Sequence, residues 1–263
     1  MRSPAELARQ EERRQAVGVS DIALEAVPVG GGFMCYTAPG SWSNYAVGLG
    51  FDGPVTDEDL ERLLDFYRSR DCAAVIEVAP YTDPTLLRGL QARGFTLREF
   101  ENVLGRPLDG EAAPHPHSTP AGLTVEVVDE ANPQELEEWV SVSTLGFRPM
   151  DEPFAPHFHD ITLRLAQHPR TTCHVARIEG EVVGGCAVEV FEDFGALFGT
   201  SVHPDHRRRG VQLALMLERL AFLERAGARF ATIGSAPGIP TERNAARIGF
   251  RPMYTKAVLE RPS

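Results

Sequence analysis

A short apolar segment, a basic turn and a long leucine-rich segment follow one another at residues 195–225, and this succession constrains the fold more than any other feature. Residues 195–202 (Gly-Ala-Leu-Phe-Gly-Thr-Ser-Val) predict a buried strand. Residues 211–225 contain no Gly or Pro and are rich in Leu, which predicts a helix. The sequence therefore predicts a strand that enters a helix through a turn containing three consecutive arginines.

This turn has the properties of an anion-binding site. The first N–H groups of a helix have no intrahelical partner, and the helix dipole adds partial positive charge there. Gly210 lets a ligand approach the backbone, and the neighbouring arginines attract a polyanion. We therefore expect a diphosphate at the turn; an arginine-rich helix start that only faces solvent is the alternative. No Gly-x-x-x-x-Gly-Lys-Ser/Thr occurs, and no Gly-x-Gly-x-x-Gly opens a helix after a strand.

The pattern Arg207-x-x-Gly210-x-Gln212 resembles the pyrophosphate loop of the GNAT family of acyl-CoA-dependent N-acyltransferases, Arg/Gln-x-x-Gly-x-Gly/Ala. Gln212 departs from that pattern, but the loop contributes a backbone N–H, which Gln also has. The resemblance implies acetyl-CoA as acyl donor, and a backbone N–H of Val202 that binds the thioester carbonyl or the pantetheine arm. The residues it implies around the pyrophosphate are His203, Arg207, Arg208, Arg209, Gly210, Val211 and Gln212.

A second stretch, residues 240–250, resembles the C-terminal signature of the same family, a short helix with an Asn followed by Gly-Phe and a strand. Asn244 matches the residue that hydrogen-bonds the pantetheine arm, and an amide suits that arm because it donates and accepts at once. A role of Asn244 in stabilising the helix alone is the alternative. The family's usual general acid, a Tyr four residues before the glycine, is replaced by Ala245.

The loss of that tyrosine leaves the acid and the base open. Tyr254 is the only tyrosine in the second half of the chain and is therefore the candidate acid for the leaving thiolate. A packed strand residue is the alternative role for Tyr254, and water would then protonate the thiolate. The candidates for the base that deprotonates the acceptor amine, with none favoured over the others, are Glu189, Glu192, Asp193 and His203.

The segment 144–160 corresponds by the same resemblance to the wall of the acceptor site. Asp151 and Glu152 in it would attract a cationic amine, and a solvated loop is the alternative. Two His-x-His pairs, at 157/159 and 115/117, have no Cys or carboxylate partner at ligand spacing. We therefore expect no metal site.

An internal repeat relates the two halves of the chain. At an offset of 155 residues, Gly94-Phe95 aligns with Gly249-Phe250, and the segments 58–70 and 75–78 align with 213–225 and 230–233. Chance similarity between two strand–helix units is the alternative. The first copy has the acidic residues 52–57 in place of the basic turn, and these would repel a diphosphate. We expect this copy to be degenerate and to serve as a scaffold.

The repeat and the resemblance together predict an α/β (α+β) fold of tandem GNAT-like domains, each a mixed, mostly antiparallel sheet flanked by helices. The expected boundaries are residues 1–108 for the degenerate domain and 122–263 for the acyl-CoA-binding domain. The Pro-rich residues 109–121 between them predict a linker.

Composition limits the compartment and the partners. A net charge of −11 argues against nucleic-acid binding, and no apolar run approaches the length of a membrane span. Residues 1–14 mix Glu and Arg without an apolar core, so we expect no signal peptide and a cytoplasmic protein. The four cysteines are scattered, which indicates buried thiols.

These patterns predict an acetyltransferase that passes the acetyl group of acetyl-CoA to a primary amine of a small molecule or a peptide, by direct attack in a ternary complex. We expect a monomer or a homodimer without nucleic-acid or membrane partners. A non-catalytic sensor of acyl-CoA is the alternative, because Ala245 replaces the usual acid.

Overall fold

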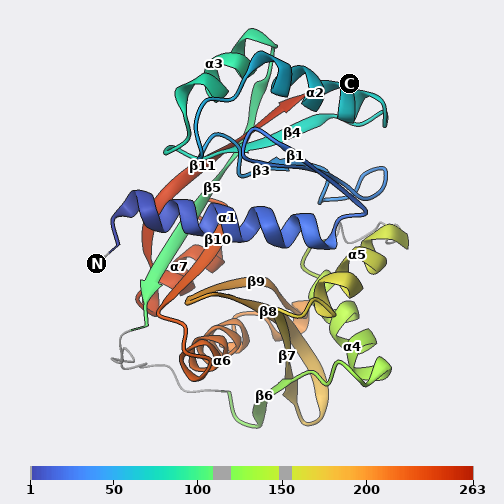
Figure 1. Cartoon of the computed structure of the whole chain (residues 1–263). Coiled ribbons are helices and arrows are strands. Elements are labelled where there is room, and N and C mark those ends of the chain that lie inside the picture. Colours follow the sequence, from blue (N-terminus) through green and yellow to red (C-terminus); the bar gives the residue numbers. More distant parts are fainter. Residues whose placement is uncertain (1, 109–119, 148–155, 263) are drawn as a thin grey trace. The chain divides into compact units, whose positions relative to one another are not determined.

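The computed structural model describes residues 2–108, 120–147 and 156–262. The chain divides into two compact units, which are described separately: unit 1 comprises residues 1–103 and 252–263, and unit 2 comprises residues 104–251. Figure 1 labels most of their helices and strands. None of the helices in the described ranges combines the length and the apolar character that crossing a membrane requires.

Unit 1 has a mixed sheet with the strand order β1-β2-β3-β4-β11-β5. The β1–β2, β2–β3 and β4–β11 pairs are antiparallel, whereas β3 and β4 are parallel. A Ser3/Glu6 capping box begins the first helix, which extends to Ile22, and the first strand begins at Glu25. The elements are α1 (Pro4–Ile22), β1 (Glu25–Val29), β2 (Gly32–Tyr36), β3 (Ala46–Val47), α2 (Asp57–Arg68), β4 (Ala74–Val78), α3 (Pro84–Ala92), β5 (Thr96–Pro107) and β11 (Arg251–Arg261).

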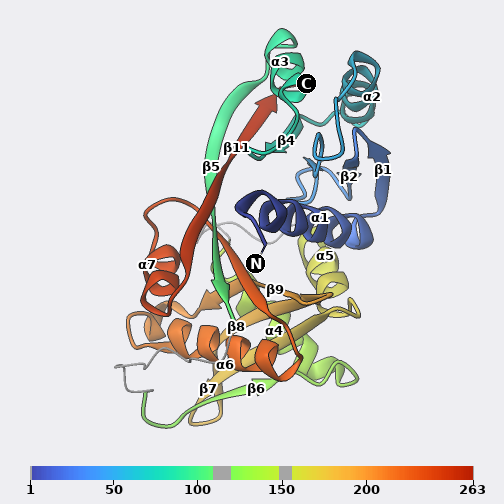
Figure 2. The ribbon, with the colours of Figure 1, turned by 60° about the vertical axis from the view of Figure 1, so that its left-hand side comes forward.

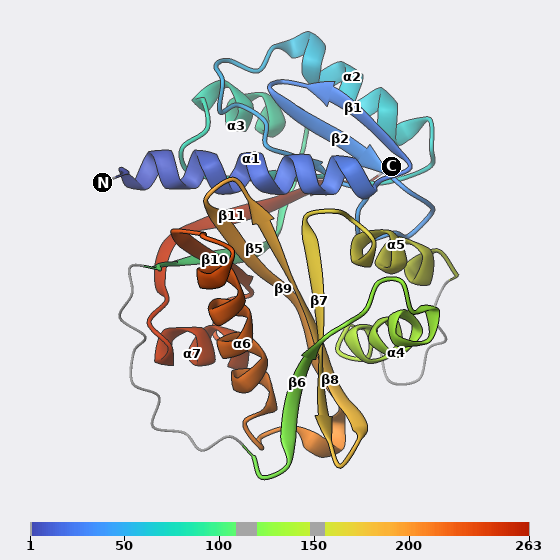
Figure 3. The same cartoon turned by 60° about the horizontal axis from the view of Figure 1, so that its bottom comes forward.

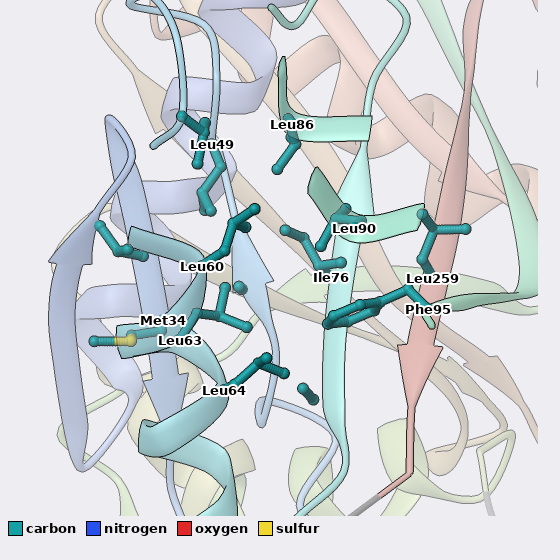
Figure 4. Close-up of a cluster of buried hydrophobic side chains, with 14 of the residues drawn as sticks. Met34, Leu49, Leu60, Leu63, Leu64, Ile76, Leu86, Leu90, Phe95 and Leu259 are labelled. Atoms are coloured by element: carbon teal, nitrogen blue, oxygen red, sulfur yellow. The ribbon is translucent and has the colours of Figure 1, made fainter. Parts of the chain in front are cut away.

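The core of unit 1 lies between its sheet and the helices α2 and α3. Leu60, Leu63 and Leu64 recur at helical spacing on α2 and are buried. They pack with Ile76 of β4 and Leu259 of β11, as Figure 4 shows. The last strand of the chain therefore contributes to the core of the first unit.

Unit 2 has the strand order β5-β10-β9-β8-β7-β6. Strands β6 to β9 pair antiparallel in succession, and β9 pairs parallel with β10. Helices α4 and α5 lie on one side of β7 and β8, and α6 lies on the other side (Figure 3). The elements are β6 (Leu123–Val127), α4 (Pro133–Thr144), α5 (Pro156–Ala166), β7 (Thr171–Ile178), β8 (Glu181–Phe191), β9 (Phe194–Val202), a 3-10 turn (Pro204–His206), α6 (Val211–Arg225), β10 (Phe230–Ser235) and α7 (Pro240–Arg247).

The repeat is visible in the order and length of the elements. Helix α2 corresponds to α6, β4 to β10, α3 to α7 and β5 to β11, with element bounds that agree with the offset seen in the sequence to within a few residues. In each unit the strand that follows the first helix of the repeat is parallel to the strand that precedes that helix: β4 is parallel to β3, and β10 is parallel to β9. The prediction of two tandem domains with mixed, mostly antiparallel sheets is confirmed.

The compact units differ from the predicted boundaries at two strands. Strand β11 pairs with β4 in unit 1, although it follows α7 of unit 2 in the sequence. The end of β5 lies in unit 2, where Leu104 packs in the core and the Arg106 guanidinium donates to Ile248 O at 2.9 Å. Hydrophobic patterning identifies a strand but does not say which neighbouring strand it pairs with. Most of the predicted linker lies outside the described residues.

Candidate functional site

Strands β9 and β10 pair only at their beginnings. The parallel ladder runs from the Phe194–Phe230 pair to the Leu197–Ile233 pair. Both strands continue beyond it, β9 to Val202 and β10 to Ser235. Backbone groups on the facing edges of these last residues are therefore not used in a β9–β10 ladder.

The other edge of β9 contains an irregularity at the same level. Its register with β8 shifts between Gly185 and Ala187, opposite residues 198–201 of β9. Gly199 has φ +60°, in the left-handed region that favours glycine. Gly199 was not predicted as a site residue, although a glycine inside an apolar strand pattern indicates a bulge.

The basic turn connects β9 to an α6 N-terminus that no side chain caps. Gly210 occupies the N-cap position with φ 87°, and the first turn of α6 carries no acidic residue. Arg207, Arg208 and Arg209 are exposed, and Arg207 Nε donates to Val202 O at 3.2 Å. Helix N–H groups without a side-chain cap beside exposed guanidinium groups are the combination that binds phosphates.

The side chain of Gln212 joins the two sequence motifs. Its Nε2 donates to Thr241 Oγ1 at 2.9 Å, and Asn244 Nδ2 donates to its Oε1 at 2.7 Å. Asn244 Oδ1 also accepts from Arg247 Nη1 at 2.9 Å. These bonds hold α7 against the start of α6 (Figure 2). The residue that departs from the family pattern thus serves as a bridge, which the sequence did not reveal.

Tyr254 lies in unit 1, on β11. It is 7% exposed, and its hydroxyl donates to Oε1 of the buried Glu12 at 2.6 Å. Burial raises the pKa of Tyr254 well above its usual range. These contacts describe a packed residue, and the role of Tyr254 as an acid stays a prediction. Ala245, at the position of the usual acid, is fully buried in the core of unit 2.

The candidate bases have different surroundings. Glu189 on β8 is 4% exposed and forms an ion pair with Arg170 at 2.9 Å. Glu192 and Asp193 lie at the β8–β9 turn, before the first residue of β9 and therefore at the opposite end from the basic turn. His203 lies at the basic turn, where its Nδ1 accepts from the Asp205 N–H at 3.4 Å. Glu189 pairs with Ala196 near the start of β9, so of the four candidates only His203 lies beside the end of β9 that leads into the basic turn.

The predicted acceptor wall is described only in part, because Arg148, Asp151 and Glu152 lie outside the described residues. On α5, His159 Nε2 lies 2.9 Å from Glu137 Oε1, and this hydrogen bond raises the pKa of His159. The pair at 115/117 also lies outside the described ranges. Within those ranges, no group of three potential metal ligands occurs.

A buried hydroxyl on β9 faces the start of that wall. Ser201 is 3% exposed, and its Oγ has no hydrogen-bond partner among the described residues. A Cβ added at Gly146, which follows α4, would lie 3.0 Å from this oxygen. Ser201 was not predicted as a site residue, because a serine in a strand carries no signal of its own.

Comparisons with known proteins agree with this geometry. Residues 134–250 match the family model described as the acetyltransferase (GNAT) family. The chain is similar to a GCN5-related N-acetyltransferase structure from Kribbella flavida, with 20% identity over 98% of this chain and 96% of that chain and a TM-score of 0.71. A search of curated proteins found no match.

Two further solved structures share the fold. One is a tandem GNAT protein from the clavulanic acid biosynthesis pathway, with 18% identity over 90% of this chain and 81% of that chain and a TM-score of 0.63. The other is a GCN5-related N-acetyltransferase from Sphaerobacter thermophilus, with 19% identity over 72% of this chain and 59% of that chain and a TM-score of 0.56. Residues 134–250 therefore match the acetyltransferase (GNAT) family model, and the N-terminal half of the chain has a second GNAT-like fold.

Proposed function

We propose that the protein is an N-acetyltransferase that transfers the acetyl group of acetyl-CoA to a primary amine. The observation that carries this proposal is the end of the β9–β10 ladder at the Leu197–Ile233 pair, close in sequence to an α6 N-terminus without a side-chain cap. An extended pantetheine arm would hydrogen-bond to the unused strand edge, and a diphosphate would bind the helix N–H groups.

The basic turn would bind the pyrophosphate. Its three exposed arginines supply positive charge, and the N–H groups of Val211 and Gln212 begin α6. Gly210 at positive φ keeps a side chain away from these N–H groups. His203 and Asn244 complete the predicted contacts, with Asn244 toward the pantetheine arm.

Two backbone N–H groups of β9 would bind the arm and the thioester. Successive residues of a strand direct their N–H and C=O groups to alternate edges. Phe198 O binds the same Arg219 Nη1 as Ala187 O of β8, so the Gly199 N–H on the other side of that trans peptide is directed to the β10 edge. The His203 N–H donates to Val183 O of β8 at 2.9 Å, so its neighbour Val202 also faces the β10 edge. We assign the thioester carbonyl to Gly199 and the arm to Val202.

In the proposed reaction the amine nitrogen attacks the thioester carbonyl carbon directly. The C–N bond forms, the C–S bond breaks, the amine loses a proton and CoA leaves as a thiolate that gains one. The Gly199 N–H would stabilise the negative charge that develops on the carbonyl oxygen. Of the predicted bases, His203 lies at the end of β9 that leads into the basic turn, whereas Glu189 is buried opposite Ala196. Tyr254 or water would protonate the thiolate.

The test is the release of free CoA thiol from acetyl-CoA with a panel of primary amines and amine-bearing peptides, beside calorimetric binding of CoA. Binding together with amine-dependent thiol release is the expected result. Absence of CoA binding would sink the proposal. We also propose that the protein is cytoplasmic, that it is a monomer or a homodimer, and that it has no nucleic-acid partner. Cell fractionation tests the location, light scattering tests the oligomeric state, and a gel-shift assay tests nucleic-acid binding.

A non-catalytic acyl-CoA sensor is the second candidate, and two positions favour it. Ala245 replaces the family's usual acid, and the hydroxyl of Tyr254 is bonded to Glu12 within unit 1. A sensor would bind acetyl-CoA tightly and release no thiol with any amine of the panel. The same pair of measurements therefore separates the two functions.

A further inference from the structure

Arg219 of α6 is fully buried beside the bulge of β9 (0% exposed). Its Nε donates to Leu215 O, one turn earlier in α6, at 3.1 Å. Its Nη1 donates to Ala187 O of β8 at 3.0 Å and to Phe198 O of β9 at 3.1 Å. Its Nη2 donates to Thr200 Oγ1 at 2.8 Å. The guanidinium group thus ties both strands to the helix at the point where their register shifts.

The positive charge of Arg219 has no negative partner among the described residues. All of its hydrogen-bond partners are neutral oxygens, and burial lowers the pKa of the guanidinium. Burying a charge without an opposite charge is costly, so such groups are rare in cores. The other buried residues of α6 are Val211, Met216 and leucines, which shows that packing against this sheet does not require a cation.

The contact with Phe198 O fixes the direction of the next amide. The peptide bonds of the described residues are trans, so the carbonyl of Phe198 and the N–H of Gly199 point in opposite directions. Because that carbonyl and Ala187 O of β8 bind the same Nη1, the carbonyl points to the β8 edge. The Gly199 N–H therefore points to the β10 edge, beyond the last β9–β10 pair.

We infer that Arg219 is a positioning residue for acyl transfer: it holds the bulge of β9 and polarises the Phe198–Gly199 peptide, so that the Gly199 N–H is a stronger donor to the thioester carbonyl. A hydrogen bond from a cation to the carbonyl of a peptide strengthens the N–H of the same peptide as a donor. The inference rests on the proposed binding of acetyl-CoA between β9 and β10, and it adds a residue that does not touch the substrate.

The experiment measures the acetyl carbonyl itself. Acetyl-CoA labelled at the carbonyl carbon is bound to the full-length protein, and its carbonyl stretch is recorded by isotope-edited infrared spectroscopy. Wild-type protein is expected to shift the band to lower frequency than in free acetyl-CoA. Arg219→Met should lose most of this shift and lower kcat about 10- to 100-fold. The affinity for CoA, which has no acetyl group, should change less than about threefold.

Three further variants guard the interpretation. Arg219→Lys keeps the charge but cannot reach both carbonyls and Thr200 at once, so an intermediate band position is expected. Thr200→Val removes one of the contacts with little change of shape and should give a smaller shift of the same sign. It also carries the test if Arg219→Met does not fold. Arg225→Met, an exposed arginine on the same helix, should leave the band unchanged.

Each outcome decides something different. A bound carbonyl band that is the same in wild-type, Arg219→Met and Thr200→Val protein would overturn the inference and leave the proposed function intact. A loss of CoA affinity equal to the loss of kcat, without a change in the band, would also overturn it, because it indicates a structural role alone. If wild-type protein does not bind acetyl-CoA, the proposed function fails and the inference fails with it.

Discussion

The two units present the same helix start in opposite states. In unit 1, α2 begins with a capping box in which Thr56 and Asp59 bond each other's backbone N–H groups, and its first turn carries three acidic residues. In unit 2, α6 begins at Gly210 without a side-chain cap and follows three arginines. A capped acidic start is stable but repels an anion, whereas an open basic start leaves donors for a ligand. The two units therefore contain the same helix start in two forms: capped and acidic in unit 1, uncapped and basic in unit 2.

The largest effect is expected from making the α6 start resemble that of α2. Gly210→Asp places a carboxylate where the proposed pyrophosphate binds and supplies a side-chain cap. We expect the Kd for CoA to rise at least about 100-fold, measured by calorimetry. Gly227→Asp is the matched control, because Gly227 has a similar φ of +80° at the other end of α6 and open space around it. An equal loss in both variants would mean that backbone strain, not the site, is responsible.

Removing the charge of the open start should have the next largest effect. Arg207→Ala combined with Arg208→Ala deletes two exposed cations and should raise the Kd for CoA about 10- to 100-fold, with a smaller change in kcat at saturation. Arg62→Ala with Arg68→Ala removes two arginines of α2 and should leave CoA binding unchanged. An affinity that is insensitive to the first pair would refute the basic turn as the phosphate site.

The units should also respond to pH in opposite directions. Burial raises the pKa of Glu77 in unit 1 from 4.5 to about 7, so the folded state holds its proton more tightly than the unfolded state and stability falls as pH rises across that window. Burial, with the charge of Arg219, lowers the pKa of His174 in unit 2 from 6.5 to about 4. The unfolded state then gains the proton first, and stability falls as pH drops across that window.

Urea unfolding between pH 4 and pH 8 measures these two slopes, each expected to amount to about 1 to 3 kcal/mol across its window. Glu77→Gln should flatten the decline toward high pH, and His174→Phe should flatten the decline toward low pH. If a substitution leaves the pH dependence of the unfolding free energy unchanged, the substituted residue is not the group responsible for it.

Tyr254→Phe is expected to give the smallest effect. The variant deprives the buried Glu12 of a donor, which should lower the free energy of unfolding by about 1 to 2 kcal/mol. If Tyr254 is the acid, kcat falls well below wild type while CoA affinity is kept. An unchanged kcat with lowered stability assigns Tyr254 to the packing of unit 1 alone.

The sequence predicted those parts of the molecule that depend on local pattern. The succession of strand, basic turn and helix around Gly210 needs only neighbouring residues, and the repeat around Gly94 and Gly249 revealed the tandem fold. The bulge could have been inferred from Gly199 in an apolar strand, but the hydrogen bonds from Arg219 to the strands around the bulge could not. An arginine in a leucine-rich helix is expected to face solvent. Only the packed structure shows which oxygens accept hydrogen bonds from the Arg219 guanidinium group.

The destination of the last strand was equally hidden. Val258 and Leu259 predict a buried strand whichever strand they pair with, and only the pairing with β4 assigns them to unit 1. The bridge from Gln212 to Asn244 joins residues 32 positions apart, and no periodicity in the sequence points to it.

The placement of β11 has a consequence for the way the chain reaches its native state. Unit 1 pairs residues 74–78 with residues 257–261, so its sheet cannot be finished while the ribosome is still producing unit 2. Until β11 is synthesised, the edge of β4 in the nascent first half has no partner strand and can pair with other chains. Cutting the gene between its two repeats would yield a fragment that lacks a central strand rather than a smaller folded protein.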